Sequence, residues 1–160
     1  MLRPVSSTRP EPQLYDVNID GIDPRLMIAS DDHLRIMVER FQGLLRRQDE
    51  GGDGALLPDR VLGMMQRLET TYTYVIARLG AREAAEEAVV YGRPTAMVTL
   101  ELPAESAVAG DRFLTLLDEA DEYCRSRPDL IDVVCPPDVA AFRTWFISEI
   151  TRQLRMVDAG

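Results

Sequence analysis

The side chain best suited to acid–base or phosphoryl chemistry in this sequence is a single histidine. His33 is the only histidine in the chain, and two carboxylates precede it in the stretch D-D-H-L-R. A histidine on the first turn of an amphipathic helix could accept a phosphoryl group. However, no second metal ligand or base lies beside this histidine in the sequence, which favours a role in capping the helix. We favour the capping role and keep His33 as a candidate for modification or partner contact.

Clustered carboxylates are the second set of residues that could do chemistry. Carboxylates three or four residues apart share a helix face and could ligate a metal. A di-iron bundle of the ferritin type needs a Glu-x-x-His pair on each of two helices, which one histidine cannot supply. We therefore expect solvated helix faces, with no metal, no cofactor and no catalytic residue. The clusters are Glu83, Glu86 and Glu87, and Asp118, Glu119, Asp121 and Glu122.

A glycine-rich stretch and two cysteines complete the search for an enzyme site. The stretch D-E-G-G-D-G at 49–54 has neither the lysine of a phosphate-binding loop nor the final glutamate of a calcium loop, so we interpret it as a surface loop. Cys124 and Cys135 lie too far apart for a C-x-x-C pair and are expected to be buried thiols. These observations make an enzyme the less favoured class.

Aromatic residues gather near the C-terminal end of the chain. Phe142, Trp145 and Phe146 recur at helical spacing. Core packing is the commoner reason for such a group, and an interface hot spot is the alternative. We select Trp145 and Phe142 as the candidates for a partner contact on this helix.

The composition limits the partners that this chain can bind. The sequence has 160 residues and a formal net charge of -9, which favours one domain with an acidic surface. We expect no nucleic-acid or membrane partner, and a cytoplasmic protein, because no apolar run approaches the length of a membrane span. A local basic patch at Arg40, Arg46 and Arg47 could override the average, but we favour a solvated helix terminus, where arginines complement the helix dipole.

The pattern of apolar residues predicts an α+β fold. Residues 1–14 are rich in proline and are expected to form a flexible tail, 15–156 a single domain, and 157–160 a disordered end. Alternation on either side of Gly21 to Pro24 predicts a β-hairpin. Helical spacing and alternation predict the other elements. The predicted helices are 31–48, 58–79, 81–91, 104–125 and 137 onward, and the predicted strands are 95–102 and 130–134.

The order of the predicted elements suggests an internal duplication. A strand followed by two helices occurs once before and once after the middle of the chain, although residue identity between the halves is low. Such a β-α-α unit used twice would build a small antiparallel or mixed sheet packed against paired helices.

Two stretches carry a resemblance to known regulatory proteins. The strand V-T-L-E-L-P and the later run P-P-D-V-A-A-F-R-T-W-F-I-S-E-I-T-R-Q-L resemble actinobacterial regulatory-type proteins of stress-response partner switching, over about residues 15–155. The same order of elements is similar to the first part of anti-sigma-factor kinases of the GHKL type, whose second helix carries Glu-x-x-x-Asn. The matching positions here are Glu149 and Gln153, so the magnesium-binding asparagine is missing.

These observations favour a regulatory function without catalysis. We expect a regulatory or adaptor protein that acts through protein–protein contacts, with a regulator or kinase as partner, and a homodimer is one form it could take. The alternative is a small-ligand or nucleotide sensor on a degenerate GHKL-like scaffold, with a pocket that Glu149 and Arg152 would line. The interaction candidates are Trp145, Phe142, Glu149 and Arg152.

Overall fold

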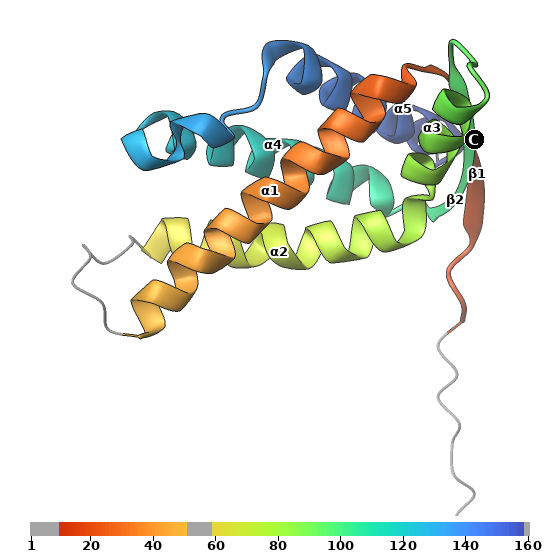
Figure 1. The fold of residues 1–160 in the computed structure, drawn as a ribbon. Helices are drawn as coiled ribbons and strands as arrows, with labels where there is room; N and C mark the ends of the chain where they lie inside the picture. The colour runs from red at the N-terminus through yellow and green to blue at the C-terminus, as the bar shows by residue number, and fades with distance from the viewer. Residues whose placement is uncertain (1–9, 51–58, 159–160) are drawn as a thin grey trace, which may run out of the picture.

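The computed structural model describes residues 10–50 and 59–158, and for 71–79 and 158 it describes the backbone alone. Within these residues the fold is α+β and mainly helical (Figure 1). In chain order the elements are β1 (Leu14–Ile22), α1 (Pro24–Asp49), α2 (Asp59–Leu79), α3 (Ala81–Val90), β2 (Ala96–Pro103), α4 (Ser106–Arg125), the 3-10 helix η1 (Pro128–Val133) and α5 (Pro137–Asp158).

The two strands form a small antiparallel sheet, as the sequence predicts. Leu14 lies opposite Pro103 and Asn18 opposite Thr99, and the register shifts after Ile19. Alternate side chains of both strands are buried, which is the pattern of a sheet with one face on the core and one toward solvent. The sheet therefore closes one side of the helical body.

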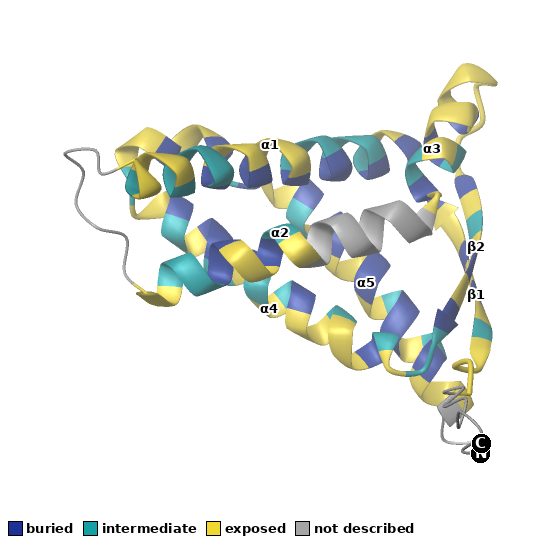
Figure 2. Ribbon diagram, turned by 90° about the horizontal axis from the view of Figure 1, so that it is seen from below, coloured by how far each residue is buried: buried dark blue, intermediate teal, exposed yellow. Residues whose placement is uncertain are grey.

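Helices cover only one face of this sheet. Both views show the strands at one side of the molecule, with the helices together on the other side (Figures 1 and 2). The longest helix, α1, packs against α2, α3 and α5, while α4 packs against α5 and α2. The core between them contains the fully buried side chains of Phe41, Met37, Leu68 and Leu117. A single contiguous core thus holds the helices and the inner face of the sheet together.

The predicted N-terminal hairpin is wrong. The chain forms one strand and then a helix that begins at Pro24, seven residues before the predicted start. The side chain of Asp23 accepts hydrogen bonds from the backbone N–H groups of Arg25 and Leu26, and proline suits the first helical position. The apolar residues of the predicted second strand belong to the inward face of α1, where Met27 is buried.

The predicted strand at 130–134 is also wrong, because this segment forms η1 instead. Pro128 opens the 3-10 helix, and the Arg127 guanidinium binds the Asp129 carboxylate at 2.8 Å beside it. The apolar residues Leu130 and Val133 are buried by this turn without any strand partner. Three-residue periodicity places them on one side of a 3-10 helix as effectively as alternation would in a strand.

The remaining predicted elements are confirmed, with shifts at their ends. Leu14, placed in the tail by the sequence, begins β1, and α5 continues to Asp158, past the predicted domain end at 156. Residues 1–9, 51–58 and 159–160 lie outside the described residues, and with them most of the predicted tail and the glycine-rich stretch. Among the described helices, none has the length and apolar character that crossing a bilayer requires.

Candidate interaction surface

His33 lies inside α1 and not on its first turn, because the helix begins at Pro24. Its Nε2 lies 2.8 Å from the backbone oxygen of Val133. A carbonyl oxygen only accepts, so Nε2 of His33 donates this hydrogen bond. Nδ1 is buried and has no hydrogen-bond partner among the described residues. The histidine thus connects α1 to the end of η1, and phosphorylation at Nε2 would require this bond to break.

The expectation that all the carboxylates lie on solvated faces is wrong for Asp121. This side chain is buried and binds Arg143 of α5, with 3.1 Å between Oδ2 and Nη2. Its other oxygen accepts the backbone N–H of Cys135 at 3.3 Å. Asp121 therefore joins α4 to the segment before α5 and to α5 itself. In the part of the chain that the structure describes, no three ligand-type side chains are placed to hold a metal ion.

The two cysteines are free and buried, as the sequence predicts. Burial, together with the nearby Asp121 carboxylate, raises the pKa of Cys124 to about 11. Burial also raises the pKa of Cys135 above its ordinary value. Both thiols are therefore protonated at neutral pH and do not act as nucleophiles in this structure.

A second charged cluster joins α1 to α3. The Arg82 guanidinium lies 2.5 Å from Asp31, 2.7 Å from Asp32 and 2.8 Å from Glu86. These hydrogen bonds, the one to Asp31 first, raise the pKa of Arg82 further above its ordinary value. Asp31 is buried, so this cluster fixes the start of α3 against α1 and is structural.

The two residues at the GHKL-like positions serve to attach α5 to β1. The carboxylate of Glu149 accepts hydrogen bonds from Arg152 at 2.5 Å and from the Gln153 amide at 3.0 Å. Gln153 in turn binds the backbone of Asn18, with its oxygen 3.0 Å from N–H and its nitrogen 2.7 Å from C=O. Their polar groups are thus engaged within the fold, and Glu149 lines neither of the hollows described below.

This arrangement predicts a pH dependence that belongs to Glu149. The hydrogen bonds from Arg152 and Gln153 lower the pKa of Glu149 from 4.5 to about 2. A carboxylate whose pKa is lowered by folding stabilises the protein above its unfolded pKa, and this contribution is lost as the pH falls toward the folded value. Glu149→Gln should therefore lower the melting temperature at pH 7, with the difference from wild type disappearing between pH 4.5 and about 2. Glu122→Gln, at an exposed carboxylate of α4, removes the same charge and is the control for the change in net charge.

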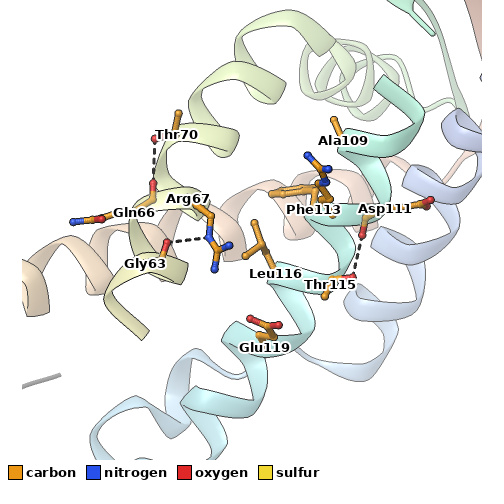
Figure 3. A pocket seen from close by; sticks show the side chains of 11 residues that line it. Gly63, Gln66, Arg67, Thr70, Ala109, Asp111, Phe113, Thr115, Leu116 and Glu119 are labelled. Carbon is orange, nitrogen blue, oxygen red and sulfur yellow. Dashed lines mark hydrogen bonds between the residues drawn. The ribbon is translucent and has the colours of Figure 1, made fainter. Parts of the chain in front are cut away.

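Two hollows on the outside of the helices share one residue and form a continuous surface. The larger, with a volume of about 960 Å³, lies between α2 and α4 (Figure 3). The smaller, of about 600 Å³, lies between α4 and α5. Asp111 of α4 lines both, so we call them together the α2–α4–α5 surface. Its floor includes the buried ring of Phe113 and the half-buried Leu116.

The charge of this surface is opposite to that of the whole chain. Four arginines line it against two carboxylates, Asp111 and Glu119, whereas the chain as a whole carries -9. Asp111 already pairs with Arg155, and Arg152 pairs with Glu149. The Arg67 Nε donates to the backbone oxygen of Gly63 at 3.2 Å. The four arginines are Arg67, Arg112, Arg152 and Arg155.

Two of these guanidinium groups are available for a partner. Arg112 is exposed and makes no hydrogen bond or ion pair with any described residue, and the terminal nitrogens of Arg67 make none either. Because Arg67 and Arg112 lie on two different helices, they form no sequence motif from which a binding site could have been predicted. The surface therefore offers uncompensated positive charge above an apolar floor.

Of the predicted interaction residues of α5, Arg152 lines this surface and Trp145 is exposed about one turn before Ser148, which also lines it. Trp145 is 42% exposed and Met156 is 65% exposed, and with Ser148 and Arg152 they recur every three or four residues along one helix face. Phe142 is buried, with its ring centroid 5.8 Å from that of Trp145. Phe142 therefore supports the tryptophan from the core, while Trp145 itself faces solvent.

The chain is therefore an α+β protein in which three helices form a surface that is both apolar and basic. No protein-family model, curated protein or solved structure matches the chain.

Proposed function

We propose that this protein is a non-catalytic regulatory or adaptor protein, and that it binds an acidic amphipathic segment of a protein partner on the α2–α4–α5 surface. The observation that carries the proposal is a pair of arginines, Arg112 and Arg67, beside the apolar floor at Phe113 and Leu116. Among the described residues, Arg112 has no hydrogen-bond or ion-pair partner and Arg67 uses only its Nε, so their terminal guanidinium nitrogens are available. A groove between two helices accepts a third helix through its apolar face, and charges at the rim select the partner and its orientation.

The negative net charge of the chain favours binding of an acidic segment at the α2–α4–α5 surface over binding elsewhere on the molecule. An acidic segment is repelled by most of a molecule that carries -9, and the arginines provide the local attraction that directs it to one surface. The resemblance to partner-switching proteins supports a cytoplasmic role in stress-response regulation, with a regulator or kinase as partner. Trp145 contributes an exposed aromatic side chain at the rim, where such residues are common binding hot spots.

The proposal predicts that charge reversal on this surface abolishes partner binding. The tagged protein is used to capture partners from its own host, and the captured protein is then titrated against the wild type and the double variant Arg67→Glu with Arg112→Glu. We expect the double variant to bind at least about tenfold more weakly, because two attractive charges become repulsive. Emission from Trp145, the only tryptophan, reports the binding.

A matched control separates a local effect from net charge. Arg25→Glu with Arg125→Glu makes the same change of charge at two exposed positions outside the surface and should leave affinity unchanged. Trp145→Ala should weaken association more than it lowers the unfolding free energy; simple unfolding of this variant would assign the tryptophan to the core. Capture of nucleic acid, or equal binding by both double variants, would contradict the proposal.

The alternative function of a small-ligand or nucleotide sensor would use the smaller hollow. Arg152 and Arg155 line it beside Ser148 and Thr151, and guanidinium and hydroxyl groups are donors that bind anions. Against this alternative, the carboxylate of Glu149 is bound by Arg152 and Gln153. A rise in melting temperature with ATP or inorganic phosphate in place of protein binding would favour the sensor.

A further inference from the structure

The two outer edges of the sheet differ in how they are covered. At the outer edge of β1, the side-chain amide of Gln153 binds both the N–H and the C=O of Asn18, at 3.0 and 2.7 Å. The amide occupies the place that a peptide group of a neighbouring strand would take. The outer edge of β1 is therefore closed at its centre by α5.

The bonds to Gln153 also establish which groups of β2 point outward. In an antiparallel pair, residues that bond to the opposite strand alternate with residues whose N–H and C=O point away from it. Asn18 is of the second kind, so its partner Thr99 is as well. By the same alternation, Met97 and Glu101 also direct their backbone groups to the outer edge of β2.

These outward groups of β2 have no partner in the described part of the chain. Among the described elements, β2 packs mainly against β1 and against α3, whose buried side chains are the alanines Ala81, Ala85 and Ala88. No described side chain binds the backbone of Met97, Thr99 or Glu101 as Gln153 binds Asn18. An unprotected strand edge is a template for another strand, and β2 has no proline before Pro103 to prevent pairing.

We propose that β2 pairs antiparallel with β2 of a second copy of this chain, about a two-fold axis at Thr99. The product is a four-stranded sheet in the order β1-β2-β2-β1. This dimer goes beyond the proposed function and does not depend on it, because the α2–α4–α5 surface lies on other elements. Two features of β2 favour a second copy as its partner: the pairing register and the exposed apolar side chains at its two ends.

The register about Thr99 satisfies every outward group without placing like charges together. Thr99 lies opposite Thr99 of the partner subunit, and Met97 lies opposite the partner's Glu101, so three residue pairs of the bonding kind form. A register centred on Glu101 would place two carboxylates opposite each other, which destabilises a strand pair. On the inner face, Val98 lies opposite the partner's Leu100, and the apolar layer continues from one copy to the other.

Exposed apolar side chains lie at both ends of β2. Val90 is 79% exposed and Tyr91 is 67% exposed just before the strand, and Val108 is 53% exposed after it. The turn that carries Tyr91 projects beyond the helical body (Figure 2). Antiparallel pairing brings the beginning of one β2 beside the end of the other, so it places these apolar groups near each other at both ends of the interface.

Cross-linking tests the register directly. Thr99→Cys places two thiols across the axis, where the Cα atoms of a bonding pair lie about 5.5 Å apart, within the range that a disulfide spans. We expect most of the oxidised variant to form a disulfide-linked dimer. Asn18→Cys, on the same face but on β1, is the control, and Cys124 and Cys135 are buried and do not react. Equal cross-linking of the two variants would overturn the proposal.

Sedimentation equilibrium tests the association without a cross-link. The wild type should sediment as a dimer of the 18.0 kDa chain, and raising the salt concentration should strengthen it because each copy carries -9. Thr99→Asp should raise the dimer dissociation constant about tenfold or more, since two like charges meet at the axis. Asn18→Asp adds the same charge on β1 and should leave it unchanged. A monomer at all concentrations, or a β2 edge that binds only a foreign peptide, would refute the dimer and leave the proposed function intact.

Discussion

Asp121→Ala should lower the free energy of unfolding by about 3–5 kcal/mol, the range for removing one partner of a buried ion pair. The side chains of Asp121 and Arg143 are 5% and 6% exposed. Removing the carboxylate leaves a buried guanidinium whose Nε and Nη1 already have no partner among the described residues. It also removes the acceptor of the Cys135 N–H. Denaturant unfolding followed by circular dichroism measures the loss.

Two controls identify the cause of that loss. Asp118→Ala, on the exposed side of the same helix, should change the unfolding free energy by less than about 0.5 kcal/mol. Asp121→Leu combined with Arg143→Leu should recover much of the loss, because replacing both charges by apolar groups is often neutral or stabilising. A loss below about 1 kcal/mol for Asp121→Ala would mean that water solvates the pair, against the burial seen here.

Gly110→Leu should lower the unfolding free energy by about 2–3 kcal/mol, because an added side chain has no room between α4 and α5. A Cβ at Gly110 would lie 2.8 Å from Cγ2 of Thr151 and 3.3 Å from Cγ2 of Ile147. Thr151 is buried and its hydroxyl binds the Ser148 carbonyl oxygen at 2.9 Å, so it cannot turn aside freely. The helices would have to separate.

The matched control for this substitution is Gly43→Leu in α1. A Cβ at Gly43 meets no other atom within 4 Å, so the substitution adds only the better helix propensity of leucine. It should therefore leave stability unchanged or raise it by up to about 1 kcal/mol. Similar destabilisation at both positions would show that the close approach of α4 and α5 is not the cause.

The elements that the sequence predicts well are those with long and regular apolar periods. Alternation at Val98, Leu100 and Leu102 identifies β2, and the stripe that begins at Val139 identifies α5. The start of α1 was missed because Leu26 and Ile28 fit alternation as well as helical spacing over so few residues. Asp23 followed by Pro24 is the helix start signal that could have decided between them.

The buried polar contacts could not have been predicted, because each joins positions far apart in the chain. Asp121 stands in a run of four carboxylates within five residues, and its partner Arg143 is on another helix. Likewise, nothing near Gln153 marks the backbone of Asn18 as its partner. Sequence patterns report which face of a helix is apolar, whereas a single polar group facing inward is specified only by the packing of the helices.

The residues selected on α5 differ in exposure: Trp145 and Arg152 are exposed, whereas Phe142 lies in the core. Their role as contact residues stays a prediction. Arg67 and Arg112 were missed, because they lie 45 positions apart and only the packing of α2 on α4 brings them to one groove. Charges spread over two helices leave no local signal in a sequence.

The bond between Gln153 and Asn18 spans 135 positions, and this separation imposes an order of events on the ribosome. β1 emerges before the other described elements, yet its partner strand is made about eighty residues later, and the amide that covers its outer edge is made later still. Until β2 and α5 have been made, β1 has no strand partner and lies next to helices that are still forming. Folding of this domain should therefore finish only after synthesis of α5, which makes the growing chain a natural client for chaperones that shield unpaired strands.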